Sequence, residues 1–146
     1  MVRLAPSVEA MLRRHCEEQY PNEACGALFG HGDGRDEAWT VTEVDAAPNQ
    51  HDDDRKRRYL VAPDFQVRAE RHARETAQDV LGFYHSHPDH PALPSEYDRA
   101  HAWFGYLYMI CSVERGRSGA LNAFTLDQQD GSFLDVDLRD EPGPAK

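Results

Sequence analysis

The chain has 146 residues, of which 40% are hydrophobic and 10% aromatic, and this size and composition are typical of one compact domain with its own core. Its 26 acidic and 16 basic residues give a formal net charge of −10, which repels phosphate backbones and makes nucleic acid an unexpected partner. The absence of any run of about 18 apolar residues argues against a membrane span, and three cysteines without a CxxC pair fit a reducing compartment, so we expect a cytoplasmic protein that does not bind membranes.

Helical spacing of apolar residues in the first quarter of the chain predicts a helix over residues 8–20, with Ser7 as its N-cap. The apolar run at residues 24–29 reads as a strand, and the glycines and aspartates after it are typical of a hairpin turn. Residues 39–44 alternate in the manner of the next strand. Residues 46–58 carry a proline, an asparagine and opposed charge blocks, which indicate an exposed loop.

The second half of the chain continues this alternation of strands and helices. A short strand is expected at residues 59–61, and Pro63 opens a second helix that ends near Thr76. The sequence VLGFY at residues 80–84 is typical of a strand buried on both faces. Ser95 caps a third helix that runs to Phe104. Three further strands are predicted at residues 106–113, 120–126 and 133–138.

These elements predict an α/β fold in which a mixed sheet of six or seven strands is sandwiched by three helices. We expect a single domain over residues 1–139 and a loose tail over residues 140–146.

Two histidines stand at the end of the buried strand, and an acid follows them. His85 and His87 are two residues apart, so their side chains point to the same face of the strand. Three prolines stiffen the loop that follows, and Asp98 then lies one turn into the third helix, where its carboxylate can face the histidines. Two nitrogens and one oxygen leave a fourth tetrahedral position for water, the pattern of a catalytic zinc site with one Zn²⁺ per chain.

This arrangement resembles the signature of the JAMM metalloproteases, also called the MPN+ family. The matching residues are His85-Ser86-His87, then Ser95 and Asp98 at the spacing of that family, and the segment PNEACG is similar to its upstream glutamate element in small bacterial members. The resemblance extends over nearly the whole chain and implies a fold related to that of cytidine deaminases. It implies that Glu23 is the general base, that His85, His87 and Asp98 bind zinc, and that Ser95 steadies the oxyanion.

Elementary chemistry supports these roles. Zinc lowers the pKa of a bound water to about 7, and the Glu23 carboxylate is the candidate to take its proton. A hydroxyl donor such as Ser95 contributes roughly 3–4 kcal/mol when it is well placed at a developing oxyanion. Ser95 also serves as a helix cap, and Ser86 faces the opposite side of the strand, which indicates a structural role.

Other residues near the motif are weaker candidates. His90 can touch substrate but reads more simply as an exposed loop histidine, and His101 can hold Asp98 from the outer shell or lie on the helix surface. Cys25 is on the same face as Glu23, where a buried core thiol is the simpler interpretation. A core role is expected for the aromatic residues Trp103, Phe104, Tyr106 and Tyr108.

The predicted function is that of a zinc metallopeptidase, a deubiquitinase-like isopeptidase that cleaves an amide bond after the C-terminal Gly-Gly of a ubiquitin-like or sulfur-carrier protein. The alternative is a non-catalytic MPN-type scaffold that binds proteins. A nucleoside-type deaminase is excluded because its His-x-Glu and Pro-Cys-x-x-Cys motifs do not occur in the chain. A DNA-repair relative would need a basic face, which the acidic composition does not supply. The sequence leaves open the residue beyond the scissile bond and the oligomeric state.

Overall fold

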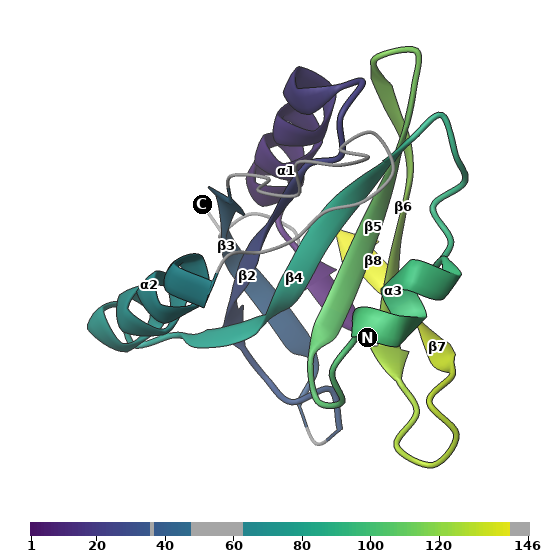
Figure 1. The fold of residues 1–146 in the computed structure, drawn as a ribbon. Helices are drawn as coiled ribbons and strands as arrows, with labels where there is room; N and C mark the ends of the chain where they lie inside the picture. Colours follow the sequence, from purple (N-terminus) through teal and green to yellow (C-terminus); the bar gives the residue numbers. More distant parts are fainter. Residues whose placement is uncertain (36, 48–62, 141–146) are drawn as a thin grey trace.

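The computed structural model describes residues 1–35, 37–47 and 63–140. The strand predicted at residues 59–61, most of the predicted loop and residues 141–146 of the tail lie outside these ranges. The described residues form one eight-stranded sheet and three helices (Figure 1). The helices are α1 Pro6–Gln19, α2 Pro63–Glu75 and α3 Glu96–His101, and the strands are β1 Val2–Leu4, β2 Cys25–His31, β3 Trp39–Ala47, β4 Asp79–Pro88, β5 Leu107–Glu114, β6 Arg117–Leu126, β7 Phe133–Val136 and β8 Leu138–Asp140.

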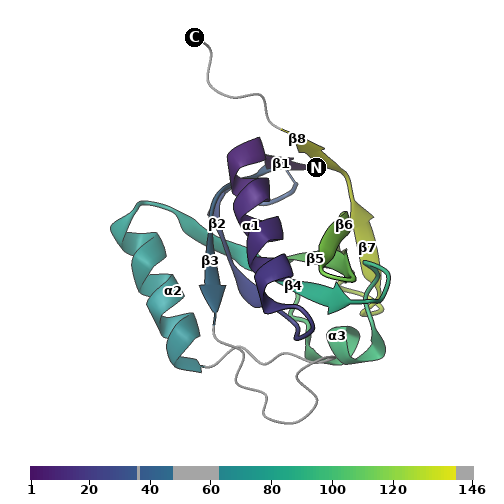
Figure 2. The same ribbon diagram turned by 90° about the horizontal axis from the view of Figure 1, so that it is seen from above.

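The sheet curves around α1. Its strand order is β7-β6-β5-β4-β2-β3-β1-β8, and the two edge strands β7 and β8 are separated in the chain only by Asp137. Because β7 pairs with β6 while β8 pairs with β1, this bend brings the two edges of the sheet toward each other. Figure 2 shows α1 enclosed by the strands, with α2 and α3 outside them. The sheet is therefore covered on both faces, as the sequence predicts.

Two hydrophobic layers hold the helices on the sheet. The inner layer joins Leu12 and Cys16 of α1 to apolar residues from six strands. The outer layer packs Phe65, Ala69 and Ala73 of α2 against β2. A burial of this kind contributes about 1.5–3 kcal/mol for each large apolar side chain. Most residues of the central strands β2, β4 and β5 are buried.

The strand count and several local predictions need correction. Two features explain why the described residues form eight strands instead of six or seven. The strand β1 was not predicted because its three residues are too few for a periodic pattern, and the last predicted strand divides at Asp137 into β7 and β8. Asp140, the first residue of the predicted tail, belongs to β8. Residues 46 and 47 extend β3 instead of opening the loop, since they pair with Gly26 and Cys25.

Helix capping and two aromatic residues also differ from the prediction. Ser7 is not the N-cap of α1, because Pro6 already occupies the first turn and Ala5 takes the cap position. Proline suits that place since its missing N–H has no partner in a helix start. Trp103 and Phe104 are 70% and 48% exposed and do not belong to the core, whereas Tyr108 is buried as expected. No helix among the described residues is long and apolar enough to cross a membrane.

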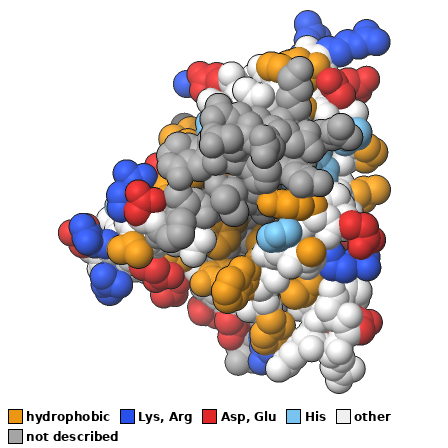
Figure 3. Space-filling view, viewed as in Figure 1, with side chains coloured by type: hydrophobic (Ala, Val, Ile, Leu, Met, Phe, Trp, Pro, Cys, Tyr) orange, Lys and Arg blue, Asp and Glu red, His pale blue; other side chains and the backbone are white. Residues whose placement is uncertain are grey.

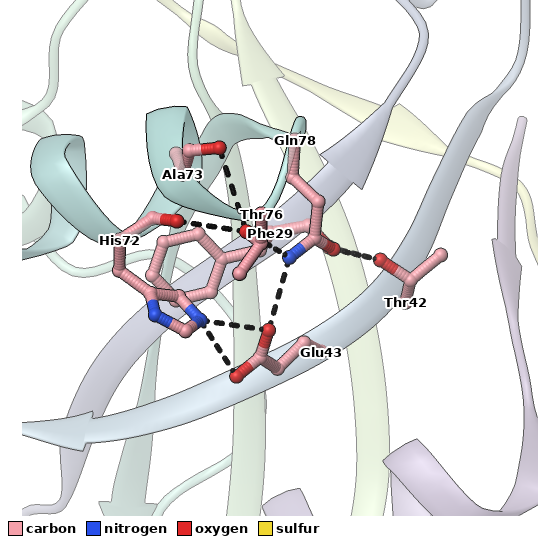
Figure 4. A network of polar contacts seen from close by, with 7 residues as sticks. All are labelled: Phe29, Thr42, Glu43, His72, Ala73, Thr76 and Gln78. Atoms are coloured by element: carbon pink, nitrogen blue, oxygen red, sulfur yellow. Dashed lines mark hydrogen bonds and ion pairs between the residues drawn. The ribbon is translucent and has the colours of Figure 1, made fainter.

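A polar network fastens the end of α2 to β3 (Figure 4). Nε2 of His72 lies 3.0 Å from both carboxylate oxygens of Glu43, and the Gln78 amide donates to the same carboxylate at 3.0 Å. Thr42 donates to the Gln78 carbonyl oxygen. The hydrogen bond to Glu43 raises the pKa of His72, and the nearby charges of Asp45 and Glu75 act in the same direction. Burial alone would raise the pKa of Glu43, but the contacts with His72 and Gln78 outweigh it and lower that pKa.

We expect the stability contribution of the His72–Glu43 pair to depend on pH. A histidine with a raised pKa stabilises the fold fully below its ordinary value of 6.5 and loses this effect as pH rises through the folded pKa. A carboxyl with a lowered pKa stabilises above its ordinary value of 4.5 and loses the effect as pH falls. His72→Gln is thus expected to lower the unfolding free energy near pH 5.5 and to have little effect at pH 9. Urea unfolding at both pH values checks this, and an equal loss at both would contradict it.

Candidate metal centre

The end of β4 presents two histidines on the outer face of the sheet. His85 and His87 alternate with Ser86, so both imidazoles point away from α1 and toward α3. Asp98 of α3 faces them. All three side chains are buried, with exposed fractions of 1%, 8% and 7%. The structure therefore brings together the three residues that the motif predicts as ligands.

The donor atoms of these residues lie close together. The Nε2 atoms of His85 and His87 lie 3.2 Å apart. Nε2 of His85 is 3.1 Å from Oδ1 of Asp98, and Nε2 of His87 is 3.1 Å from Oδ2 of Asp98. Atoms bound to Zn²⁺ at about 2.0–2.2 Å in a tetrahedron lie roughly 3.3–3.6 Å from one another. The distances among the donor atoms are close to this spacing, so the three side chains can converge on one ion.

The protonation states also suit a cation. Nδ1 of His87 donates to the Pro91 carbonyl at 2.8 Å, which leaves a lone pair on Nε2. Burial lowers the pKa of His85 and favours its neutral form. Burial would raise the pKa of Asp98, but the contacts with His85 and His87 outweigh it and hold that pKa below its usual range. Two imidazole nitrogens and one carboxylate oxygen are a donor set that zinc uses in hydrolytic enzymes.

A capping box holds Asp98 in place. The Ser95 hydroxyl accepts from the Asp98 amide at 3.1 Å, while Oδ2 of Asp98 accepts from the Ser95 amide at 2.8 Å. These reciprocal bonds fix the start of α3, so the Asp98 carboxylate is oriented before any ligand binds. The predicted cap is confirmed, and α3 ends at His101, three residues earlier than predicted.

Glu23 reaches the same region from the segment before β2. Cys25 pairs with His85 in the antiparallel register, and the Ser86 amide donates to the Ala24 carbonyl at 3.0 Å. Continuing the register by one residue from Ala24 and Ser86 would place Glu23 opposite His87 on the same face. Glu23 is 2% exposed and lines a cavity of about 250 Å³ together with His87 and Ser95.

The remaining lining residues of this cavity are mainly apolar. They are Pro88, His90, Pro91 and Leu93. Hydrophobic side chains gather on this face of the molecule, with histidine side chains among them (Figure 3). The cavity thus combines apolar side chains with a few polar groups beside the candidate metal centre, which is typical of binding sites.

The structure also places the weaker candidates. His101 is exposed, donates from Nδ1 to the Tyr97 carbonyl and stacks on the Tyr97 ring, so it does not hold Asp98. His90 is an exposed loop residue at the cavity. Cys25 is fully buried among apolar residues, and burial raises the pKa of its thiol to about 12, with the Glu23 charge as a further cause.

Sequence reasoning missed a link that joins the two walls of the site. Tyr20 donates to Asp89 at 2.7 Å, and the other oxygen of Asp89 accepts from the Arg115 amide at 3.0 Å. These bonds tie the segment before Glu23 to the loop after His87. Asp89 has a positive φ of 57°, which aspartate tolerates better than most residues and which the motif HSHPD does not reveal.

The curved α/β sheet and the His85-His87-Asp98 cluster together define a domain with a candidate hydrolytic metal centre on its central strand. Comparison with known families identifies it further. Residues 5–127 match the family model described as prokaryotic homologs of the JAB domain, and the chain belongs to this family. The resemblance to small JAMM/MPN proteins inferred from the sequence is confirmed.

Solved structures agree with this assignment. A Salinibacter ruber protein is 36% identical, with a TM-score of 0.75 over 99% of this chain and 94% of its own. A Desulfitobacterium hafniense protein is 26% identical, with a TM-score of 0.83 over 97% and 93%. A JAB1/MPN domain protein from Archaeoglobus fulgidus shares the fold at 15% identity, with a TM-score of 0.60 over 97% and 98%.

One curated relative carries an enzyme name. It is the Desampylase of Haloferax volcanii, which is 39% identical over 95 residues. The match covers 64% of this chain and 65% of the relative, so the chain spans somewhat less than two thirds of the relative's length.

Proposed function

We propose that the protein is a zinc-dependent isopeptidase that acts on a small ubiquitin-like protein. The observation that carries this proposal is the cluster of His85, His87 and Asp98 donor atoms, with contacts of 3.1–3.2 Å, beside a cavity lined by Glu23, His87 and Ser95. Membership in the family of prokaryotic JAB homologs supports it. The enzyme name of the Haloferax volcanii relative favours catalysis over the scaffold alternative.

The ligands would be Nε2 of His85, Nε2 of His87 and the Asp98 carboxylate. When bound, Zn²⁺ supplies Lewis-acid chemistry, which acidifies water and polarises a carbonyl group. Glu23 accepts a proton from the attacking water and delivers it to the leaving amine, as a buried carboxylate at the cavity wall can do. The Ser95 hydroxyl accepts from the Asp98 amide through its lone pair, so its own proton is available to the oxyanion that forms at the carbonyl.

The proposed scissile bond follows a C-terminal Gly-Gly sequence of the ubiquitin-like or sulfur-carrier protein. An extended tail can bind through its backbone, and we infer a passage at the metal centre that is too narrow for side chains larger than hydrogen. The apolar walls of the cavity, Pro88, Pro91 and Leu93, suit a segment without charge at this position. Selection of glycine would therefore be steric.

We expect a ubiquitin-like substrate ending in Gly-Gly to be cleaved with a kcat/KM at least about 100-fold higher than its Ala-Ala counterpart, because each added methyl group meets the wall of the passage. The assay joins both tails to cysteine, to lysine and to a reporter amine, and measures the initial rate with zinc-loaded protein. An unrelated peptide amide is the control. Equal cleavage of the two tails, or cleavage of the unrelated amide alone, would defeat the substrate assignment.

The scaffold alternative predicts a different result. A non-catalytic binding module would bind the Gly-Gly protein and leave its amide bond intact, with or without a bound metal. Binding without turnover, measured on the same zinc-loaded preparation by calorimetry and by the rate assay, would therefore favour the scaffold.

A further inference from the structure

Ser86 stands between the two histidines, and its side chain points to the opposite face of the sheet. We propose that Ser86 is a positioning residue for Glu23: its hydroxyl anchors the backbone of Ala24 and thereby sets the distance between the Glu23 carboxylate and the metal centre. This inference rests on the proposed function, because Glu23 is taken there as the proton acceptor.

The contact between Ser86 and Ala24 is reciprocal. The Ala24 amide donates to Oγ of Ser86 at 2.8 Å, and the Ser86 amide donates to the Ala24 carbonyl at 3.0 Å. Both residues are almost fully buried, with exposed fractions of 0% and 1%. In a regular antiparallel pair the Ala24 amide would donate to the main-chain carbonyl of its partner. Here the serine side chain accepts instead, so the residue type matters at this position.

This anchor lies directly beside Glu23. The ladder between β2 and β4 begins at the Cys25–His85 pair and proceeds away from the site. Ala24, the neighbour of Glu23 in the chain, is held by Ser86 on the inner face of the sheet, while His85 and His87 face outward. A change in the Ser86–Ala24 contact is therefore passed to Glu23 through a single peptide link.

The surroundings of Ser86 explain why a small hydroxyl is required. Ser86 is paired with Cys111 of β5 in the parallel register, and Ala24 and Cys111 belong to the apolar layer around α1. A buried amide in such a layer needs an acceptor from the protein, because bulk water cannot accept its hydrogen bond there. Alanine removes the acceptor, cysteine replaces it with a weaker one of similar size, and threonine keeps it with one added methyl group.

Displacement of the general base is expected to lower the catalytic rate without removing any metal ligand. Shifting a reacting group by about 1 Å can cost roughly 100-fold in rate. The histidine ligands lie on the other face of β4. Nδ1 of His87 is hydrogen-bonded to the Pro91 carbonyl, and the carboxylate of Asp98 accepts from the Ser95 amide, so neither contact involves Ser86. Loss of the Ser86 hydroxyl should therefore spare metal binding.

The test compares Ser86→Ala, Ser86→Cys and Ser86→Thr in the zinc-loaded full chain. We expect alanine to lower kcat by about 10- to 100-fold with nearly unchanged KM and zinc content, cysteine to lower it less, and threonine to restore most of it. In a Glu23→Gln background, Ser86→Ala should cause no further loss, because the two changes act through one group. Additive losses, or a failure of threonine to restore kcat, would overturn the proposal.

Two additional measurements separate this inference from other causes. Cys111→Ala, a matched truncation in the same buried layer, is expected to keep kcat within about twofold. Hydrogen exchange of the Ala24 amide, followed by NMR in the metal-free chain, should quicken at least tenfold in Ser86→Cys but not in Cys111→Ala. Unchanged protection of Ala24 would refute the anchor even if the protein cleaves nothing, whereas loss of protection in an inactive protein would refute only the isopeptidase function.

Discussion

Glu23→Gln is expected to bind zinc normally and to lose about 10²- to 10⁴-fold in kcat. The amide has nearly the shape of the carboxylate but cannot accept a proton from water. Glu23 is buried and lines the cavity together with His87 and Ser95, which is the place that the proposed base requires. The measurement is kcat on the Gly-Gly substrate together with zinc content by atomic emission.

A matched control separates this effect from a general change in charge. Glu18 is an exposed carboxylate of α1, and Glu18→Gln removes the same charge without touching the cavity. This variant should retain full activity. Activity of Glu23→Gln equal to that of Glu18→Gln would remove Glu23 from the mechanism. A parallel loss of zinc would instead give Glu23 a role in binding the metal.

Local patterns in the sequence were sufficient for the central part of the fold. The apolar runs at residues 24–29 and 80–84 predict β2 and β4, because strands covered on both faces need apolar residues at nearly every position. The spacing of His85 and His87 predicts that both imidazoles share one face, which the period of a strand guarantees. Ser95 followed three residues later by Asp98 predicts the cap of α3.

Features that depend on long-range pairing could not be predicted in this way. The three residues of β1 pair with β3 and β8, and the three residues of β8 pair with β1, although β1 and β8 lie far apart in the sequence. Trp103 and Phe104 are aromatic but lie in the turn after α3, where no layer covers them. The contact of Ser86 with Ala24 requires the register of β2 against β4, which no local pattern contains.

The meeting of Glu23 with the histidines illustrates the same limit. Ala24 and Ser86 are 62 positions apart in the sequence. The family resemblance predicts that Glu23 belongs to the site, whereas residue periodicity does not. The structure adds the physical cause, since the contact between the two segments continues past Cys25–His85 to Ala24 and Ser86, which are the chain neighbours of Glu23 and of the two histidines. Residues that share a site through sheet register are thus found from the sequence only when a known motif joins them.

His87→Ala is expected to abolish stable zinc binding and, with it, all turnover. The wild-type chain should hold about one zinc, and loss of one of three protein ligands should weaken binding by far more than the roughly 10- to 100-fold that loss of an outer partner costs. The two remaining donors, Nε2 of His85 and one oxygen of Asp98, lie 3.1 Å apart and form only one edge of the coordination tetrahedron.

Zinc content after dialysis against a weak chelator measures this effect, and competition with a chromophoric chelator gives the affinity. His101→Ala is the matched control, because His101 lies on α3 near Asp98 but is exposed and stacked on Tyr97. That variant should keep about one zinc per chain. Full occupancy in His87→Ala would contradict the ligand assignment. Equal loss of zinc in both variants would mean that the position of α3, which carries Asp98, limits zinc binding, because the contacts of His101 are with Tyr97 and it is not part of the His85-His87-Asp98 group.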